Sequence, residues 1–270
     1  MTDLALAMEA VKAGMAGFVT KCHQGDTSAR AAVVEEAMGL LYPGKDFRVW
    51  GGVVLNYGAG GLNPSAVYAS GKMGGRFVWF PTVDAENDAL YKKKHASQQG
   101  LGNANEQPIR KNKIRILDEQ GVLIPEVKEI LQQVKAFNMV LATGHIAVQE
   151  SLALVRAAAA MGIQKILVNH VSLPITNASL ALQKEYIDNG AMVEHCYYTP
   201  MAGLCSWEEI AESIRTLGPE HVILSTDLGQ PANGSPVEGM EKFAEQLHSL
   251  GILEEELYQM MAVNPERLLY

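Results

Sequence analysis

Two histidines stand at the ends of two successive apolar runs in this 270-residue sequence. His145 follows the run MVLAT, His170 follows the run KILVN, and a segment of helical pattern joins the two. A single histidine at the end of a buried strand is most often a structural residue. Two of them in corresponding positions predict one shared site, where imidazole can bind a metal ion or transfer a proton.

Side chains that can bind a metal or move a proton also end nearly every other apolar run. They are Lys21, His23, Asn56, Asp84, Glu194, His195 and Asp227. Neutral imidazole and carboxylate are the usual ligands of Zn²⁺ and Mn²⁺, so His145, His170 and Asp227 are the expected ligands. A carboxylate such as Asp227 can also accept the proton of a water molecule that the metal has made more acidic.

Two pairs of neighbouring residues can be assigned to faces of their strands. Lys21 and His23 are two residues apart, so they share a face if the strand stays regular to its end. We expect Lys21 to stabilise charge and His23 to act as a metal ligand or an acid. Glu194 and His195 are adjacent and point to opposite faces, so at most one of them faces the site.

The elements that must position these residues alternate between strand and helix. Strands are predicted at 17–23, 47–56, 76–85, 139–145, 165–170, 191–197 and 221–227. Helices are predicted at 2–13, 27–40, 63–73, after 125, after 148, at about 176–188, after 206, at 237–249 and at 264–269. The polar stretch 86–112 has no clear period and is predicted to be an insertion, followed by a small hairpin around 119–121.

Strands that are apolar nearly throughout, separated by amphipathic helices, indicate a parallel sheet with a covered outer face. Seven strands preceded by a helix fit a (β/α)8 TIM-like barrel whose first strand is missing. A doubly wound sheet is disfavoured because no strand is followed by a G-x-G-x-x-G turn. Residues 1–270 are therefore expected to form one barrel domain, with an insertion and hairpin at about 86–124 and functional residues at the C-terminal strand ends.

The composition narrows the classes of function. The formal net charge of −8 and a pI near 5.4 argue against a nucleic-acid surface. No apolar stretch reaches membrane-spanning length, and the first residues lack the features of a signal peptide. Three cysteines in no metal-type pattern predict reduced thiols, which is typical of a cytoplasmic protein.

Several motifs together resemble one superfamily. The series TGHI, VNH and STD, followed by NPERLL near the C-terminus, is similar to the amidohydrolase superfamily of metal-dependent hydrolase barrels. The segments AGMAGFVTKCH, GGVVLNYGAGGLNP and FVWFPTVDA resemble a bacterial branch of these hydrolases. The resemblance maps the fifth-strand His, sixth-strand His and eighth-strand Asp of the superfamily onto His145, His170 and Asp227.

The sequence departs from this superfamily in one respect. The superfamily carries a His-x-His pair at the end of its first strand, and this sequence contains no such pair. We therefore expect a site with one divalent metal, Zn²⁺ first and Mn²⁺ as the alternative. His23 is expected to be an additional ligand, and Lys21 and Asp227 the catalytic groups.

The resemblance implies hydrolysis of an amide, ester or lactone bond in a small organic molecule. Asn56, Tyr57, Glu194 and Tyr197 are the expected substrate-binding residues. A non-oxidative decarboxylase of the same superfamily is an alternative, and so is a catalytically silent barrel that binds a small molecule or a partner. A barrel without its first strand exposes two sheet edges, so we expect a homo-oligomer.

Overall fold

The computed structural model describes residues 1–99, 113–230 and 232–270 of the chain. Its strands are β1 (Gly17–Val19), β2 (Arg48–Trp50), β3 (Gly52–Val54), β4 (Phe77–Trp79), β5 (Val140–Ala142), β6 (Ile166–Val168), β7 (Met192–Cys196) and β8 (Val222–Ser225). All pairs of neighbouring strands are parallel: β1 pairs with β2, and β3 to β8 form a six-stranded sheet in chain order. Each strand lies inside a segment predicted from the sequence.

The two sheets are parts of one layer that bends at Gly51. β2 and β3 are consecutive in the chain and separated by this residue alone. A side chain at Gly51 would place its Cβ 2.6 Å from the backbone of Thr27, and the hydroxyl of Thr27 hydrogen-bonds with Gly52. A glycine is therefore required where the strand turns, and β2 with β3 corresponds to the one strand predicted at 47–56.

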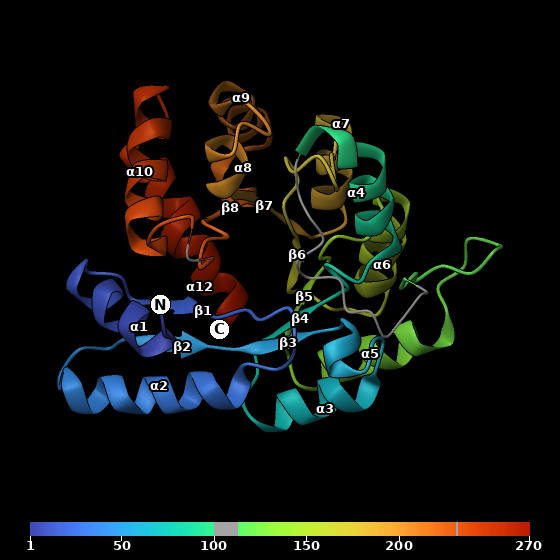
Figure 1. The fold of residues 1–270 in the computed structure, drawn as a ribbon, viewed down its shortest axis with the longest axis horizontal. Helices are drawn as coiled ribbons and strands as arrows, with labels where there is room; N and C mark the ends of the chain where they lie inside the picture. Colours follow the sequence, from blue (N-terminus) through green and yellow to red (C-terminus); the bar gives the residue numbers. More distant parts are fainter. Residues whose placement is uncertain (100–112, 231) are drawn as a thin grey trace.

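The helices are α1 (Asp3–Lys12), α2 (Ser28–Leu41), α3 (Pro64–Lys72), α4 (Glu86–Gln99), α5 (Pro125–Ala136), α6 (Val148–Ala160), α7 (Leu180–Asp188), α8 (Tyr198–Met201), α9 (Trp207–Leu217), α10 (Pro236–Ser249), α11 (Glu254–Tyr258) and α12 (Asn264–Leu269). Shorter turns are η1 (Tyr57–Ala59), η2 (Pro219–His221) and the π-helical η3 (Gln259–Val263). Long helices surround the strands, and both chain ends lie beside β1 (Figure 1).

Two predictions about helices need correction. Residues 86–99 form α4 rather than an irregular insertion, and residues 100–112 lie outside the described part of the chain. The periodicity argument missed α4 because this helix is mostly polar and has no apolar stripe. The helix predicted from about 176 begins at Leu180, because the hydroxyl of Ser179 caps it by accepting from the backbone N–H of Leu182.

Alternation along the strands separates an inner core from an outer one. Inner-facing residues such as Val54, Trp79, Leu167 and Ile223 form one buried cluster, which the terminal helix α12 closes with its leucines. The intervening residues pack against the surrounding helices in a larger cluster. This two-residue period decides which strand-end side chains face the barrel interior.

The sheet is not closed between its first and last strands within the described residues. β1 pairs only with β2 there, and β8 only with β7. A cavity of about 1430 Å³ lies between them, and α1, α10 and the C-terminal helices surround it. No helix in the described ranges is both long and apolar enough to cross a membrane.

Candidate metal centre

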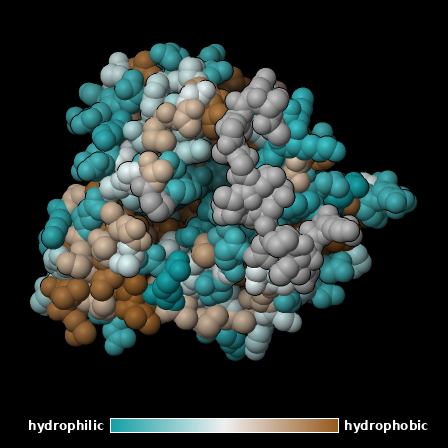
Figure 2. Space-filling model, in the orientation of Figure 1, coloured by the Kyte–Doolittle hydropathy of each residue, from teal (hydrophilic) through white to brown (hydrophobic). Residues whose placement is uncertain are grey.

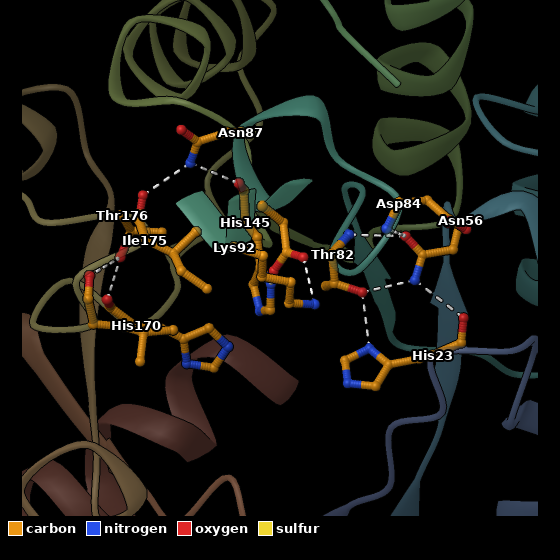
Figure 3. Close-up of polar contacts among 12 residues, drawn as sticks. His23, Asn56, Thr82, Asp84, Asn87, Lys92, His145, His170, Ile175 and Thr176 are labelled. Carbon is orange, nitrogen blue, oxygen red and sulfur yellow. Dashed lines mark hydrogen bonds and ion pairs between the residues drawn. The ribbon is translucent and has the colours of Figure 1, made fainter. Parts of the chain in front are cut away.

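Three histidine rings meet at the C-terminal ends of the strands. His23 follows β1, His145 follows β5 and His170 follows β6. The ring centre of His145 lies 6.3 Å from that of His23 and 5.4 Å from that of His170. Figure 3 shows the three rings side by side although they come from distant parts of the chain.

Each of these rings uses its Nδ1 atom for a contact with the surrounding protein. Nδ1 of His145 lies 3.0 Å from Oδ1 of Asp88, a buried residue in the first turn of α4. Burial alone would raise the pKa of Asp88, but its contacts with His145 and Lys92 together outweigh this and lower the pKa. The ionised carboxylate can only accept, so Nδ1 of His145 carries a proton and donates it to Asp88.

His170 is held in the same way from β7. Its Nδ1 lies 3.0 Å from the Sγ atom of Cys196 and 3.3 Å from Oε2 of Glu194. Its Nε2 is buried and has no hydrogen-bond partner among the described residues. A buried ring nitrogen without a partner is costly, and a metal ion is one group that would satisfy it.

His23 completes the set. Its Nδ1 lies 2.8 Å from Oγ1 of Thr82, and that hydroxyl also accepts a hydrogen bond from the side-chain amide of Asn56. Burial, reinforced by the positive charge of Lys21, lowers the pKa of His23 to about 3. Burial also lowers the pKa of His170 to about 4. Both rings are therefore neutral near pH 7, which is the form that binds a metal.

Asp227 and Lys21 face each other beside the histidines. The Nζ atom of Lys21 lies 3.2 Å from Oδ1 of Asp227. Burial alone would lower the pKa of Lys21, but the negative charges of Asp227 and Glu194, with the hydrogen bond to Asp227, together outweigh it and raise the pKa. Burial would likewise raise the pKa of Asp227, but Lys21 and the neighbouring His170 and His145 together outweigh it and lower the pKa. Both groups are charged at neutral pH.

Backbone strain coincides with two of the expected ligands. Among the described residues, four that are not glycine have a positive φ, and two of these are Asn138 and Asn177. The other two are His170 at 53° and Asp227 at 51°. Such strain costs of order 1–3 kcal/mol and tends to occur at functional sites.

Gly144 explains the TGH motif at the end of β5. Its φ is 65°, and a Cβ there would lie 2.2 Å from the carbonyl oxygen of Phe80. Only glycine fits this turn, which carries the chain from β5 directly to His145.

The structure uses several other predicted residues differently. Asn56 is buried: its amide donates to the carbonyl oxygen of His23 and to Thr82, and its oxygen accepts from the backbone of Thr82. It therefore supports His23 rather than facing a substrate. Tyr197 packs its ring against Trp207 and Phe243, which places it among the helices instead of at the predicted substrate site.

The other two predicted substrate-binding residues are Glu194, which contacts His170, and Tyr57, which contacts Asp84. The buried Glu194 accepts hydrogen bonds from Asn169 and Ser225 and lies beside His170, so its oxygens already have protein partners. Tyr57 begins η1, and its backbone N–H donates to Oδ2 of Asp84. Its role in substrate binding stays a prediction.

Sequence reasoning missed the residues that orient the rings. Asp88 and Asn87 lie in the helix that was predicted to be an insertion, and the side chain of Asn87 donates to the carbonyl oxygens of His145 and Ile175 (Figure 3). Cys196 is not among the residues predicted for the site, but its Sγ lies 3.0 Å from Nδ1 of His170. Burial and the charge of Glu194 raise the pKa of this thiol well above its ordinary value, so it is neutral.

Comparisons with known proteins place the fold. The model of a family described as "Family of unknown function (DUF6282)" matches residues 1–194. No curated protein matches the chain in sequence. Among solved structures, the phosphotriesterase homology protein from Escherichia coli, complexed with phosphate in its active site, is 16% identical with a TM-score of 0.59, over 99% of this chain and 88% of that one.

Two further structures are similar over the same length of this chain. The organophosphorus hydrolase from Deinococcus radiodurans is 14% identical, with a TM-score of 0.56 over 99% of this chain and 82% of that one. A structure described as molecular engineering of organophosphate hydrolysis activity from a weak promiscuous lactonase template is 16% identical, with a TM-score of 0.56 over 99% and 85%. The predicted resemblance to metal-dependent hydrolase barrels is thus confirmed for the fold.

Proposed function

The chain belongs to the DUF6282 family, and we propose that it is a metal-dependent hydrolase that acts on an amide, ester or lactone bond of a small organic molecule. One observation carries the proposal. The Nδ1 atoms of three neighbouring imidazoles are engaged by protein partners, and the Nε2 atom of His170 is buried without a partner in the described part of the chain. This arrangement suits a bound cation better than it suits a structural core.

His23, His145 and His170 would hold the metal, with Asp227 as a fourth ligand or as the general base. Neutral nitrogen donors and one carboxylate favour Zn²⁺, with Mn²⁺ as the second choice. A bound divalent metal lowers the pKa of water and polarises the bond to be cleaved.

The residues around the histidines supply the rest of the chemistry. Asp227 is ionised at neutral pH, so it can take the proton that an attacking water loses. The ammonium group of Lys21 can stabilise the negative charge that develops on the substrate oxygen. Asp88 and Glu194 contact the Nδ1 atoms of His145 and His170 and so fix the orientation of each ring.

The similar solved structures support this proposal, because they share the fold and two of them are described as acting on organophosphates or as derived from a lactonase. In barrels of this type the active site lies at the C-terminal ends of the strands. The three histidines lie at the ends of β1, β5 and β6, in agreement with that rule.

The test combines metal content with a panel of substrates. The protein is loaded with Zn²⁺ or Mn²⁺, and metal per chain is measured for the wild type and for the His145→Ala and His170→Ala variants. Amides, esters and lactones are then assayed, and release of CO₂ from aromatic carboxylates is followed separately. We expect the wild type to bind metal and to hydrolyse a substrate of the panel. The His145→Ala and His170→Ala variants should lose both the metal and the hydrolysis.

His221→Ala is the matched control, because His221 lies in η2 before β8, away from the other histidines. It should keep wild-type metal and activity. Wild-type metal content in both site variants would overturn the metal site. CO₂ release without hydrolysis would instead support a decarboxylase, and a metal-loaded protein inactive on the whole panel would argue for a silent barrel.

A further inference from the structure

Helix α2 has apolar residues on both sides. Its inner side buries Ala31, Val34 and Met38 against α1 and β2. On its outer side, Val33 is 67% exposed and Leu40 is 79% exposed. A surface helix normally has a polar outer face, so apolar residues on both sides indicate that a second surface covers this one.

Figure 2 shows hydrophobic residues gathered at the lower left, where Figure 1 places the end of α2 that leads to β2. Isolated exposed apolar residues are ordinary, but a continuous patch marks an interaction site.

The exposed residues of α2 have a regular spacing. Ala29, Val33, Glu36 and Leu40 follow one another at intervals of four, three and four residues, and all four are exposed. This is the spacing of the contact stripe of a two-stranded coiled coil. Ala32 and Gly39, which flank the stripe, are small enough to let another helix approach closely.

We propose that α2 packs antiparallel against α2 of a second copy of this chain, around a two-fold axis. The stripe is self-complementary in that arrangement. Ala29 faces Leu40 of the second copy, and Val33 faces Glu36 of the second copy. Every contact is then repeated by the symmetry, as an isologous interface requires.

The charges on the same face select the antiparallel orientation. A parallel pair would place Glu36 next to its own counterpart, which is unfavourable. In the antiparallel pair, Arg30 of the second copy lies about 4.5 Å along the helix axis from Glu36, within reach of its long side chain. The side chain of Arg30 is half exposed, although it also pairs with Asp3.

The size of the contact predicts a weak dimer. α2 has 14 residues, which correspond to a length of about 21 Å. One helix pair of this length buries less than the roughly 1,200–2,000 Å² of a stable interface. The association should therefore depend on concentration, with Glu36 as the residue that limits its strength.

Sedimentation equilibrium of the full chain over a wide concentration range tests the proposal. Val33→Glu and Leu40→Glu should each weaken the dimer at least about tenfold. Leu90→Glu is the control, because Leu90 is 59% exposed on α4 and lies outside the stripe. Circular dichroism establishes that each variant is folded.

The Glu36→Leu variant tests the same contact through a gain in dimer affinity, which a misfolded protein would not show. It should tighten the dimer about tenfold, since an apolar residue replaces a charge that faces Val33. A wild type and a Glu36→Leu variant that are both monomeric at every concentration would overturn the proposal. A dimer that Val33→Glu and Leu40→Glu leave intact would also overturn it, because the chains would then associate through another surface.

Cross-linking separates the two orientations. Ala29→Cys protein mixed with Leu40→Cys protein should form a disulfide under mild oxidation, whereas Ala29→Cys alone should not exceed the wild type. Efficient cross-linking of Ala29→Cys to itself would indicate the parallel pair and contradict the antiparallel one.

Discussion

His170 and His195 are two fully buried histidines that serve the molecule differently. Burial lowers the pKa of each to about 4, so both rings are neutral. The ring nitrogens of His195 both have partners, with Ser172 at 2.6 Å from Nδ1 and Ser213 at 3.0 Å from Nε2. The ring of His170 has partners at Nδ1 and none at Nε2 among the described residues.

The difference follows from the alternation along β7. Glu194 and Cys196 point to the inner face and hold His170, whereas His195 points outward toward α9. The outer network is complete within the protein, because Ser213 also donates to Gln183. Burial and a shifted pKa therefore do not distinguish a structural histidine from a ligand. What sets His170, the proposed ligand, apart is a ring nitrogen without a partner among the described residues.

The largest expected effect comes from exchanging the two rings for alanine. His170→Ala should lower the affinity for Zn²⁺ more than about 100-fold, because it removes a ligand. His195→Ala should keep the metal but lower the free energy of unfolding by about 3–5 kcal/mol, because it leaves a cavity and two hydroxyls without their partner. Zn²⁺ titration and urea unfolding measure the two effects. Equal loss of metal in both variants would abolish the distinction between them.

The second prediction concerns the carboxylate that orients His145. Asp88→Asn should weaken metal binding about 10–100-fold, because an amide no longer holds the Nδ1 proton as a carboxylate does. Glu86→Gln is the matched control in the same turn of α4, since Glu86 pairs with Arg115 at the surface. Zn²⁺ titration of both variants measures the effect. If Glu86→Gln lowered the affinity for Zn²⁺ as much as Asp88→Asn, α4 would act only through its packing.

The strand-end histidines could be predicted because their placement is local. The apolar run predicts the strand, and His145 or His170 directly after it is the side chain at the strand end. In a parallel barrel the C-terminal ends of the strands lie together. The two-residue period along β7 predicts that Glu194 and His195 point to opposite faces, and the structure shows that Glu194 is the one that faces inward. The same period places residue 197 outward, with His195, so the substrate role expected for Tyr197 was inconsistent with the predicted strand.

The orienting residues could not be predicted because their contacts depend on tertiary approach. Asp88 lies 57 residues before His145 in the chain, in a polar helix without an apolar stripe. Thr82 reaches His23 only because β4 ends beside β3, and Asn56 bridges the two. Neither Asp88 nor Thr82 belongs to a local pattern that could be recognised in the sequence alone. Asn56 does end a predicted strand, but its contact with Thr82 depends on the same tertiary approach.

The third prediction removes one hydrogen-bond partner from each of the two histidines, Ser213 from His195 and Cys196 from His170. Ser213→Ala leaves the buried Nε2 of His195 without a partner and should cost about 1–3 kcal/mol of stability. Cys196→Ala should lower metal affinity less than about tenfold, since Glu194 remains 3.3 Å from Nδ1 of His170. Urea unfolding and Zn²⁺ titration measure them. A large loss of metal in Cys196→Ala would mean that the thiol, and not the carboxylate, holds the ring.

The last prediction concerns the pH dependence of stability. Because burial lowers the pKa of His195 from 6.5 to about 4, the unfolded chain binds a proton there that the folded chain does not, across that interval. The stability that this neutral ring contributes is complete above pH 6.5 and is lost as the pH falls toward 4. The slope amounts to about 1.4 kcal/mol per pH unit for one proton. His195→Gln should remove that share of the slope in urea unfolding of the metal-free protein between pH 4 and 6.5, and a slope equal to that of the wild type would show that His195 does not titrate in this range.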